Sequence, residues 1–279
     1  MGFIKKFGSD PMGERIYALV YGEEGIGKTR MVLDLVKKHR DYVVLFSLDR
    51  GDLAVRQDPE AFEGRLTVAY PKSLAELRSD MHEAELIIAQ LAKKGIPRAK
   101  IWVVVDTVTH LQSKLLAEAR KINVRNPESK DSRKEYVRDA VVEVDYGINL
   151  AHMSELADFL VGVKANVVVT ALEKRERIKR EETGRVQPSI SGQSATRLQG
   201  DADVIVQLTI DKKGERFLAL GRASSLGKDR SDRLDDREPA DLKLLQQKIV
   251  GPRSTTPALP PNTSKPDENG ESAETPSPE

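Results

Sequence analysis

Blocks of apolar residues alternate with amphipathic stretches along most of the chain. Short runs rich in Val, Ile, Leu and Tyr predict strands, and they lie at residues 15–21, 42–48, 66–69, 101–105, 166–170, 202–210 and 216–220. Apolar positions at helical spacing predict helices over residues 28–39, 73–94 and 146–163. The run IWVVV has no polar position, which is typical of a strand buried on both faces of a parallel sheet. The alternation predicts an α/β fold with a mostly parallel central sheet flanked by helices.

The character of the chain changes near residue 251. From there to residue 279 it holds seven of the 14 prolines and no aromatic residue. Such a segment buries too little apolar surface to offset its ordering entropy, so we expect a disordered, solvated tail; the alternative is an acidic tail that docks a partner or competes with DNA. We therefore predict an N-terminal arm over residues 1–13, a folded domain over 14–250 and a tail over 251–279.

Composition narrows the classes of function. The 279 residues include 45 Lys and Arg against 44 Asp and Glu, and the tail carries two of the former and five of the latter. Residues 1–250 thus hold 43 basic and 39 acidic residues, a net charge of +4 that permits nucleic-acid binding without requiring it. No cysteine is present, which excludes disulfides and thiolate zinc sites. We expect no transmembrane helix, no secretory signal at MGFIKKFGSD, and a cytoplasmic location.

Two polar stretches interrupt the predicted elements, at residues 123–134 and 173–193. Both follow predicted strands at the edge that carries the glycine-rich turn after residues 15–21. The carboxyl edge of a parallel sheet is where ligands bind, so we expect both stretches to be mobile and to lie near a ligand site.

A phosphate-binding motif follows the first predicted strand. Residues 22–29, GEEGIGKT, match the P-loop pattern G-x-x-x-x-G-K-[ST] at every fixed position and precede a predicted helix. Backbone N–H groups of such a loop and the helix N-terminus face the phosphates of ATP. The predicted nucleotide-binding residues are Gly22, Glu23, Glu24, Gly25, Ile26, Gly27, Lys28, Thr29 and Arg30. Lys28 would contact the β- and γ-phosphates, and we expect it to be a solvated side chain whose replacement by Ala leaves the fold intact.

Carboxylates at the ends of two neighbouring strands complete the predicted site. Asp106 directly follows the run 101–105, so we expect it to hold Mg²⁺ through water together with the Thr29 hydroxyl; otherwise it would cap a helix. Asp49 ends the run 42–48 and is the candidate that orients the attacking water, with Asp52 in reserve. An acidic residue at a strand end is also a common turn former.

These elements together resemble the RecA-like branch of P-loop ATPases. The shared pattern is a P-loop, a carboxylate in FSLDRG, a strand ending in IWVVVDT, a long helix and a further strand. More closely, the chain resembles the compact single-domain ATPases of bacteriophages and prophages, members of which act beside single-strand-binding protein in recombination and annealing. The resemblance covers about residues 14–235 and includes the segments DYGINLAHMSELADFL, NVVVTALEKRE, SGQSATRLQGDADVIVQL and GRASSLGKDRSDRL.

The resemblance implies further roles for residues of this chain. The end of the strand at 166–170 would carry a sensor that reports the γ-phosphate to a DNA-binding loop. Leu172 stands where RecA-like proteins place Gln and related phage proteins often place His, so Thr170 or a catalytic Glu173 would substitute. Lys228 and Arg230 resemble the Lys-x-Arg motif that acts on the nucleotide of a neighbouring subunit; otherwise they belong to a solvated charged loop.

The charged segment at residues 173–185 is the candidate DNA contact. Mixed charge of this kind is more often a solvated helix face, but its place beside the sensor favours a phosphate contact. No aromatic residue lies between 173 and 193, so contact would be with the backbone and indifferent to base sequence. The predicted DNA-binding residues are Lys174, Arg175, Arg177, Lys179 and Arg180.

Three functions agree with the sequence. The first is a Mg²⁺-dependent ATPase that assembles on single-stranded DNA as a ring or filament, with single-strand-binding protein as a further partner. The second is an accessory or scaffold ATPase whose nucleotide controls binding of a protein partner without direct DNA action. The third is a motor of a larger replication or packaging machine, which the lack of an additional DNA-loading domain disfavours.

Overall fold

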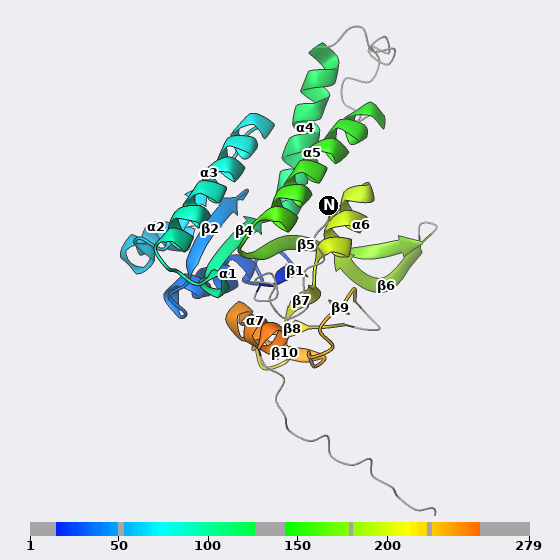
Figure 1. Cartoon of the computed structure of the whole chain (residues 1–279). Helices are drawn as coiled ribbons and strands as arrows, with labels where there is room; N and C mark the ends of the chain where they lie inside the picture. Colours follow the sequence, from blue (N-terminus) through cyan, green and yellow to red (C-terminus); the bar gives the residue numbers. More distant parts are fainter. Residues whose placement is uncertain (1–14, 50–52, 126–142, 179–180, 222–224, 252–279) are drawn as a thin grey trace, which may run out of the picture.

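The computed structural model describes residues 15–49, 53–125, 143–178, 181–221 and 225–251 (Figure 1). The predicted arm, residues 1–13, and the predicted tail beyond residue 251 lie outside these residues, so the division into arm, domain and tail stays a prediction. Of the polar stretch predicted at 123–134, the part beyond residue 125 also lies outside them.

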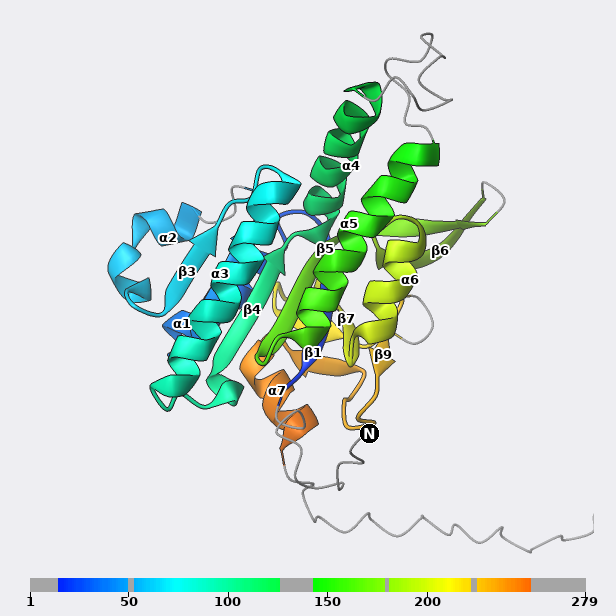
Figure 2. The same ribbon diagram turned by 45° about the horizontal axis from the view of Figure 1, so that its top comes forward.

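A mostly parallel sheet forms the centre of the fold (Figures 1 and 2). Its parallel strands run in the order β3-β2-β4-β5-β1-β7. Their bounds are β1 Tyr17–Gly22, β2 Tyr42–Ser47, β3 Leu66–Ala69, β4 Ile101–Asp106, β5 Asn166–Ile178 and β7 Val204–Ile210. The predicted α/β class is therefore confirmed, and β5 lies between the strand of the P-loop and the strand that ends in Asp106.

Antiparallel strands extend the sheet on the side of β7. β8 (Arg216–Ala219) and β9 (Lys228–Asp229) pair with β7, β10 (Arg237–Pro239) pairs with β8, and β6 (Glu181–Pro188) pairs with β5. The outer part of β5 and β6 form a hairpin that protrudes from the body in both views (Figures 1 and 2).

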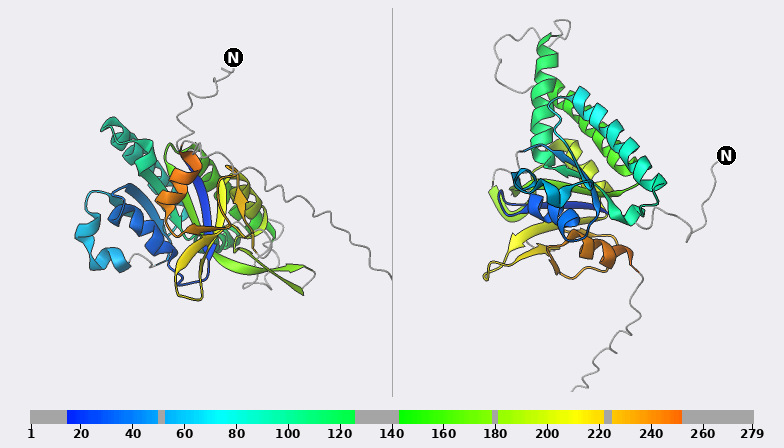
Figure 3. Two further views of the ribbon diagram at one scale, coloured as in Figure 1. Left: turned by 90° about the horizontal axis from the view of Figure 1, so that it is seen from below. Right: turned by 90° about the vertical axis from the view of Figure 1, so that its left-hand side faces the viewer.

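Two layers of helices cover the sheet because side chains of each parallel strand alternate between its faces. On one face lie α3 (Leu74–Lys93), α4 (Val108–Arg125), α5 (Glu143–Gly162) and α6 (Gly192–Asp201), packed on Leu19, Phe46 and Val103. On the other lie α1 (Lys28–Lys37) and α7 (Leu242–Val250), packed on Ala18, Val20 and Leu45 (Figure 3). The remaining short elements are α2 (Leu53–Gln57), η2 (Pro59–Phe62) and η3 (Arg98–Lys100).

The largest difference from the sequence prediction concerns the charged stretch at 173–193. No strand was predicted here, whereas β5 continues to Ile178 and β6 begins at Glu181; the mobility of the stretch stays a prediction. A two-stranded ribbon of this kind exposes both faces, so its residues need not alternate between apolar and polar and no strand pattern is visible.

The helices α4, α6 and α7 were also not predicted, although apolar residues at 108, 111, 115 and 119 repeat at helical spacing in α4. No helix among the described residues is long and apolar enough to cross a membrane.

Candidate nucleotide site

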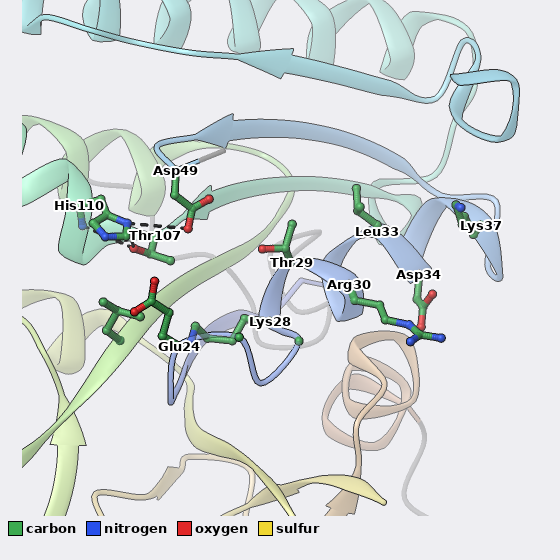
Figure 4. A pocket seen from close by; sticks show the side chains of 13 residues that line it. Glu24, Lys28, Thr29, Arg30, Leu33, Asp34, Lys37, Asp49, Thr107 and His110 are labelled. Carbon is green, nitrogen blue, oxygen red and sulfur yellow. Dashed lines mark hydrogen bonds and ion pairs between the residues drawn. The ribbon is translucent and has the colours of Figure 1, made fainter. Parts of the chain in front are cut away.

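The P-loop lies between β1 and α1 in the conformation that its glycines permit. Gly25 and Gly27 have φ values of 74° and 108°, a region that residues with a Cβ rarely adopt. A Cβ on Gly27 would also lie 2.8 Å from Nε of Arg216. The loop thus brings its backbone N–H groups and the start of α1 to one side of a cleft of about 550 Å³ (Figure 4).

Lys28 is buried, with 5% of its surface exposed. Its Nζ donates hydrogen bonds to the carbonyl oxygens of Gly22 at 2.9 Å and Glu23 at 2.7 Å. Burial lowers the pKa of Lys28, and nearby carboxylates, Asp106 first among them, oppose that shift. The expectation of a solvated lysine is therefore wrong, because the loop's own carbonyls bind the ammonium group.

Asp106 is held by two hydroxyl groups. Thr29 Oγ1 donates to Asp106 Oδ2 at 2.6 Å, and the Thr170 hydroxyl donates to Oδ1. Only 1% of Asp106 is exposed; burial raises the pKa of this carboxyl, and the hydrogen bonds from Thr170 and Thr29 lower it. A carboxylate and a hydroxyl beside a phosphate loop are hard oxygen donors, so the residues fit Mg²⁺.

Asp49 lies across the cleft from the P-loop (Figure 4). Its Oδ2 is 3.7 Å from Nδ1 of His110, and that same nitrogen is 3.2 Å from Oγ1 of Thr107. Sequence reasoning missed Thr107 and His110 at this site, although both follow directly on the strand that carries Asp106. Asp52, the reserve candidate, lies outside the described residues.

The two alternatives for the sensor occupy different places. Thr170 contacts Asp106, as described above, whereas the Glu173 carboxylate accepts a hydrogen bond from Gln207 Nε2 at 3.0 Å. Glu173 lines a second groove on the other side of the P-loop together with Glu23 and Glu24. Leu172 lines the main cleft. The structure thus brings Thr170 to the predicted metal ligand and leaves Glu173 outside the main cleft; the catalytic role of Glu173 stays a prediction.

Three of the five candidate DNA-binding residues belong to the β5–β6 hairpin. Lys174, Arg175 and Arg177 lie on β5, and the side chain of Lys174 donates to the carbonyl of Ile190 at 2.8 Å. The pairing with β6 shifts between Arg175 and Arg177. Lys179 and Arg180 lie outside the described residues. The described part of the segment forms strands rather than the helix face that mixed charge usually indicates.

Lys228 and Arg230 lie at the opposite edge of the sheet from the P-loop. β9 pairs with Val204 and Ile205 at the start of β7, whereas the P-loop follows the end of the parallel strand β1. Lys228 Nζ donates to the carbonyls of Gln199 and Gly200 at 2.8 Å each, and Arg230 donates to the carbonyl of Gly200. Within the described chain, both cations therefore bind the C-terminal end of α6, and their action on a neighbouring subunit stays a prediction.

Two further residues, Arg216 and Thr109, contact the site without belonging to a motif. Arg216, the first residue of β8, donates from Nε to the carbonyl of Ile26 in the P-loop at 2.6 Å. On α4, Thr109 Oγ1 donates to the carbonyl of Ser189 at 3.0 Å and accepts the N–H of Leu172 at 3.0 Å. Such contacts join segments far apart in the chain, so they depend on the fold rather than on a local pattern.

Gln112 extends the attachment of α4 to the hairpin. Its side-chain amide donates to the carbonyl of Ser191 at 3.0 Å and accepts the N–H of Ser191 at 2.9 Å. Because Ser189 and Ser191 follow β6, the first turns of α4 hold both strands of the hairpin at its base.

Comparison with known proteins adds a family. A family model described as an AAA domain matches residues 14–231. No curated protein matches the chain in sequence. One similar solved structure is the RadB recombinase, with 18% identity, a TM-score of 0.36, and coverage of 73% of this chain and 79% of that chain.

Two ATPases of type III secretion systems are also similar. The first, a prototypical ATPase from pathogenic bacteria, has 12% identity, a TM-score of 0.44, and coverage of 78% of this chain and 57% of that chain. The second, the assembled ATPase EscN from enteropathogenic E. coli, has 14% identity, a TM-score of 0.40, and coverage of 70% and 43%. The chain thus spans about half the length of each secretion ATPase.

Proposed function

Because the chain belongs to the AAA domain family, whose model matches residues 14–231, we propose that it binds and hydrolyses ATP with Mg²⁺ and acts on single-stranded DNA in phage recombination, annealing or repair. The observation that carries the proposal is the 2.6 Å contact between Thr29 and Asp106 directly beside the P-loop. It brings together the hydroxyl and the carboxylate that a P-loop ATPase uses to hold its metal.

In this proposal each part of the cleft has one task. Backbone N–H groups of residues 22–30 would bind the phosphates, and Thr29 and Asp106 would hold Mg²⁺, which would supply positive charge to the bound triphosphate. Lys28 exchanges the carbonyls of Gly22 and Glu23 for phosphate oxygens, which places its charge where it stabilises the transition state. Asp49 orients the attacking water from the opposite wall of the cleft.

The hairpin supports a role on DNA. The hairpin that carries Lys174, Arg175 and Arg177 protrudes from the body, and contacts of Lys and Arg with phosphates bind DNA without regard to base sequence. The attachment of its base to α4 supports control by nucleotide, since Thr109 comes three residues after Asp106 and contacts both Leu172 on β5 and Ser189 directly after β6. Thr109 and Gln112 would then do the work that a Gln or His sensor does in RecA-like proteins.

Self-association into a ring or filament is part of the proposal. Lys228 and Arg230 lie at the sheet edge away from their own P-loop, which is the side from which a neighbouring nucleotide could be reached. To reach it they would release the carbonyls at the end of α6. Single-strand-binding protein is a further proposed partner.

The test is the ATPase rate of the full chain with and without single-stranded DNA at low and high salt. We expect stimulation by DNA that weakens as salt rises, because phosphate contacts release counterions. ATP turnover that is indifferent to DNA would instead support the scaffold function, and absence of turnover in every condition would refute the ATPase.

A matched pair of variants connects the stimulation to the hairpin. Arg175→Gln with Arg177→Gln should weaken DNA binding and reduce its salt slope by about one to two units. Lys93→Gln with Lys94→Gln removes the same charge at the exposed end of α3. This pair should leave the DNA affinity and its salt slope unchanged. Equal effects of the two pairs would show that only net charge matters.

A further inference from the structure

His110 lies where Asp49 can be held from the side. Asp49 follows β2 and His110 lies on the first turn of α4, which begins two residues after the end of β4. The two strands are parallel neighbours with Ser47 paired to Asp106, so the residues just beyond their ends meet at one edge of the cleft (Figure 4). We propose that His110 is a positioning residue that orients the Asp49 carboxylate for attack by water; the inference rests on the hydrolysis proposed above.

The backbone around Asp49 is fixed to β4 and α4. The N–H of Leu48 donates to the carbonyl of Asp106 at 2.8 Å, and Lys114 Nζ donates to the carbonyl of Leu48 at 2.9 Å. Ser47 Oγ donates to the backbone carbonyl of Asp49 at 2.9 Å. These contacts fix where the side chain of Asp49 starts, and the direction of its carboxylate then depends on two rotatable bonds.

The imidazole of His110 is itself held by Thr107. Oγ1 of Thr107 lies 3.2 Å from Nδ1 and also accepts the backbone N–H of His110 at 3.4 Å. This pairing turns Nδ1 toward the side of the cleft where Oδ2 of Asp49 lies 3.7 Å away.

The separation of 3.7 Å is that of an ion pair and is longer than a hydrogen bond. Both side chains are about one-third exposed, so a small rotation brings them together. Hydrogen bonds of catalytic groups are often long without substrate and shorten in the complex. A carboxylate fixed in this way holds the attacking water closer to the position from which it attacks the γ-phosphate. The rate of phosphoryl transfer depends strongly on that position.

Leu172 also lines this cleft, and its apolar side chain cannot donate a hydrogen bond to a phosphate or a water. His110 and Thr107 therefore supply hydrogen-bonding groups close to the position where the attacking water would lie.

The experiment compares single-turnover and steady-state hydrolysis in His110→Ala and His110→Asn. We expect His110→Ala to lower kcat by about 10-fold or more while KM and ATP affinity change less than about twofold, because the loss is confined to the transition state. In His110→Asn the amide nitrogen lies close to the position of Nδ1, so most of the rate should return. His82→Ala replaces an exposed histidine on α3 and should match the wild type.

A binding measurement separates positioning from damage to the fold. Affinity for ADP with aluminium fluoride, a transition-state analogue, should fall in His110→Ala, while affinity for a non-hydrolysable ATP analogue should not. In Asp49→Asn, adding His110→Ala should cost nothing further, because the two residues act as one unit.

Three results would overturn the inference while leaving the proposed ATPase intact. The first is a wild-type kcat in His110→Ala. The second is a kcat in the Asp49→Asn, His110→Ala double variant that falls by the product of the two single losses. The third is an equal loss of affinity for ADP with aluminium fluoride and for the non-hydrolysable ATP analogue. Absence of hydrolysis in the wild-type chain would instead refute the proposed function itself.

Discussion

The hydroxyl of Thr29 and the carboxylate of Asp106 are 77 positions apart in the chain and meet at 2.6 Å. Parallel strands bring them together, since β1 and β4 both end at the edge that carries the P-loop and only β5 lies between them. The contact leaves a carboxylate buried at 1% exposure, stabilised by two hydroxyl groups rather than by a direct ion pair.

Asp106→Asn should stabilise the nucleotide-free protein and remove the effect of Mg²⁺. Burial raises the pKa of Asp106, so the folded state binds the proton of this carboxyl more tightly than the unfolded state does. At pH values above the ordinary pKa of an aspartate, the ionised carboxylate therefore lowers the free energy of unfolding. An amide removes that cost, worth about 1 kcal/mol or about 2–4 °C in Tm. Thermal unfolding with and without Mg-ATP measures both effects.

The control for this variant is Glu83→Gln, which removes one charge from an exposed position on α3. It should alter neither Tm nor the shift produced by Mg-ATP. A lower Tm in Asp106→Asn would contradict the view that the buried charge is a burden in the nucleotide-free state.

Lys28→Ala should abolish nucleotide binding and also lower the stability of the protein. The variant leaves the carbonyls of Gly22 and Glu23 without their donor, a cost of about 1 kcal/mol. Titration with a fluorescent ATP analogue and thermal unfolding report the two effects separately. Lys94→Ala, at an exposed position after α3, is the matched control, and ATP binding retained in Lys28→Ala would refute the site.

Thr109→Val should uncouple DNA binding from nucleotide. The variant keeps the shape of the side chain but removes the hydrogen bonds to Ser189 and Leu172. We expect ATP affinity and nucleotide-free DNA affinity within about twofold of wild type, while the enhancement of DNA affinity by ATP falls by about five-fold or more. Fluorescence anisotropy of labelled single-stranded DNA measures all three quantities.

Ser113→Ala is the matched control for Thr109→Val. Its exposed hydroxyl donates only within α4, to the carbonyl of Thr109, so the variant should keep the full enhancement. The coupling through Thr109 is refuted when wild type shows a nucleotide effect on DNA affinity and Thr109→Val shows the same effect.

His152 predicts a loss of stability in mildly acidic solution. Burial lowers the pKa of this histidine below its ordinary value of 6.5, and its Nδ1 has no hydrogen-bond partner among the residues that the structure describes. As pH falls below about 6.5 the unfolded chain binds a proton there that the folded chain does not, so unfolding becomes easier. Between pH 7 and pH 5.5 we expect this residue to lower Tm by about 2–4 °C.

Thermal unfolding of His152→Gln over the same pH range checks the assignment. The variant cannot gain the charge, so its Tm should depend less on pH than that of wild type. His82→Gln removes an exposed histidine and should keep the wild-type slope; equal slopes in wild type and His152→Gln would rule out His152 as the cause.

The parts of the site that lie in contiguous sequence could be predicted. The P-loop is a local motif because its glycines and Lys28 act within one turn of backbone, and Asp106 follows a strand whose burial is evident from its composition. The α/β class follows from the same local alternation. His110, Thr109 and Arg216 could not be assigned in this way, because each acts on a residue brought near by strand order and helix packing.

The burial of Lys28 shows a different limit. Its sequence neighbours predict a lysine beside phosphates, but whether it is solvated or folded back depends on acceptors that the loop itself supplies. The hairpin could not be predicted for a third reason. Arg175 and its neighbours lie on a strand without a buried face, so apolar and polar residues do not alternate there.

Arg216 has a consequence for how the molecule tolerates change. Its hydrogen bond to the carbonyl of Ile26 attaches the P-loop to β8, which pairs with β10, the strand that precedes α7. Substitutions in β8 or β10 can thus shift the P-loop and change the affinity for ATP, although no residue of the P-loop motif is altered. In variants selected for weaker or tighter ATP binding, we therefore expect substitutions in β8 and β10 as well as in the P-loop.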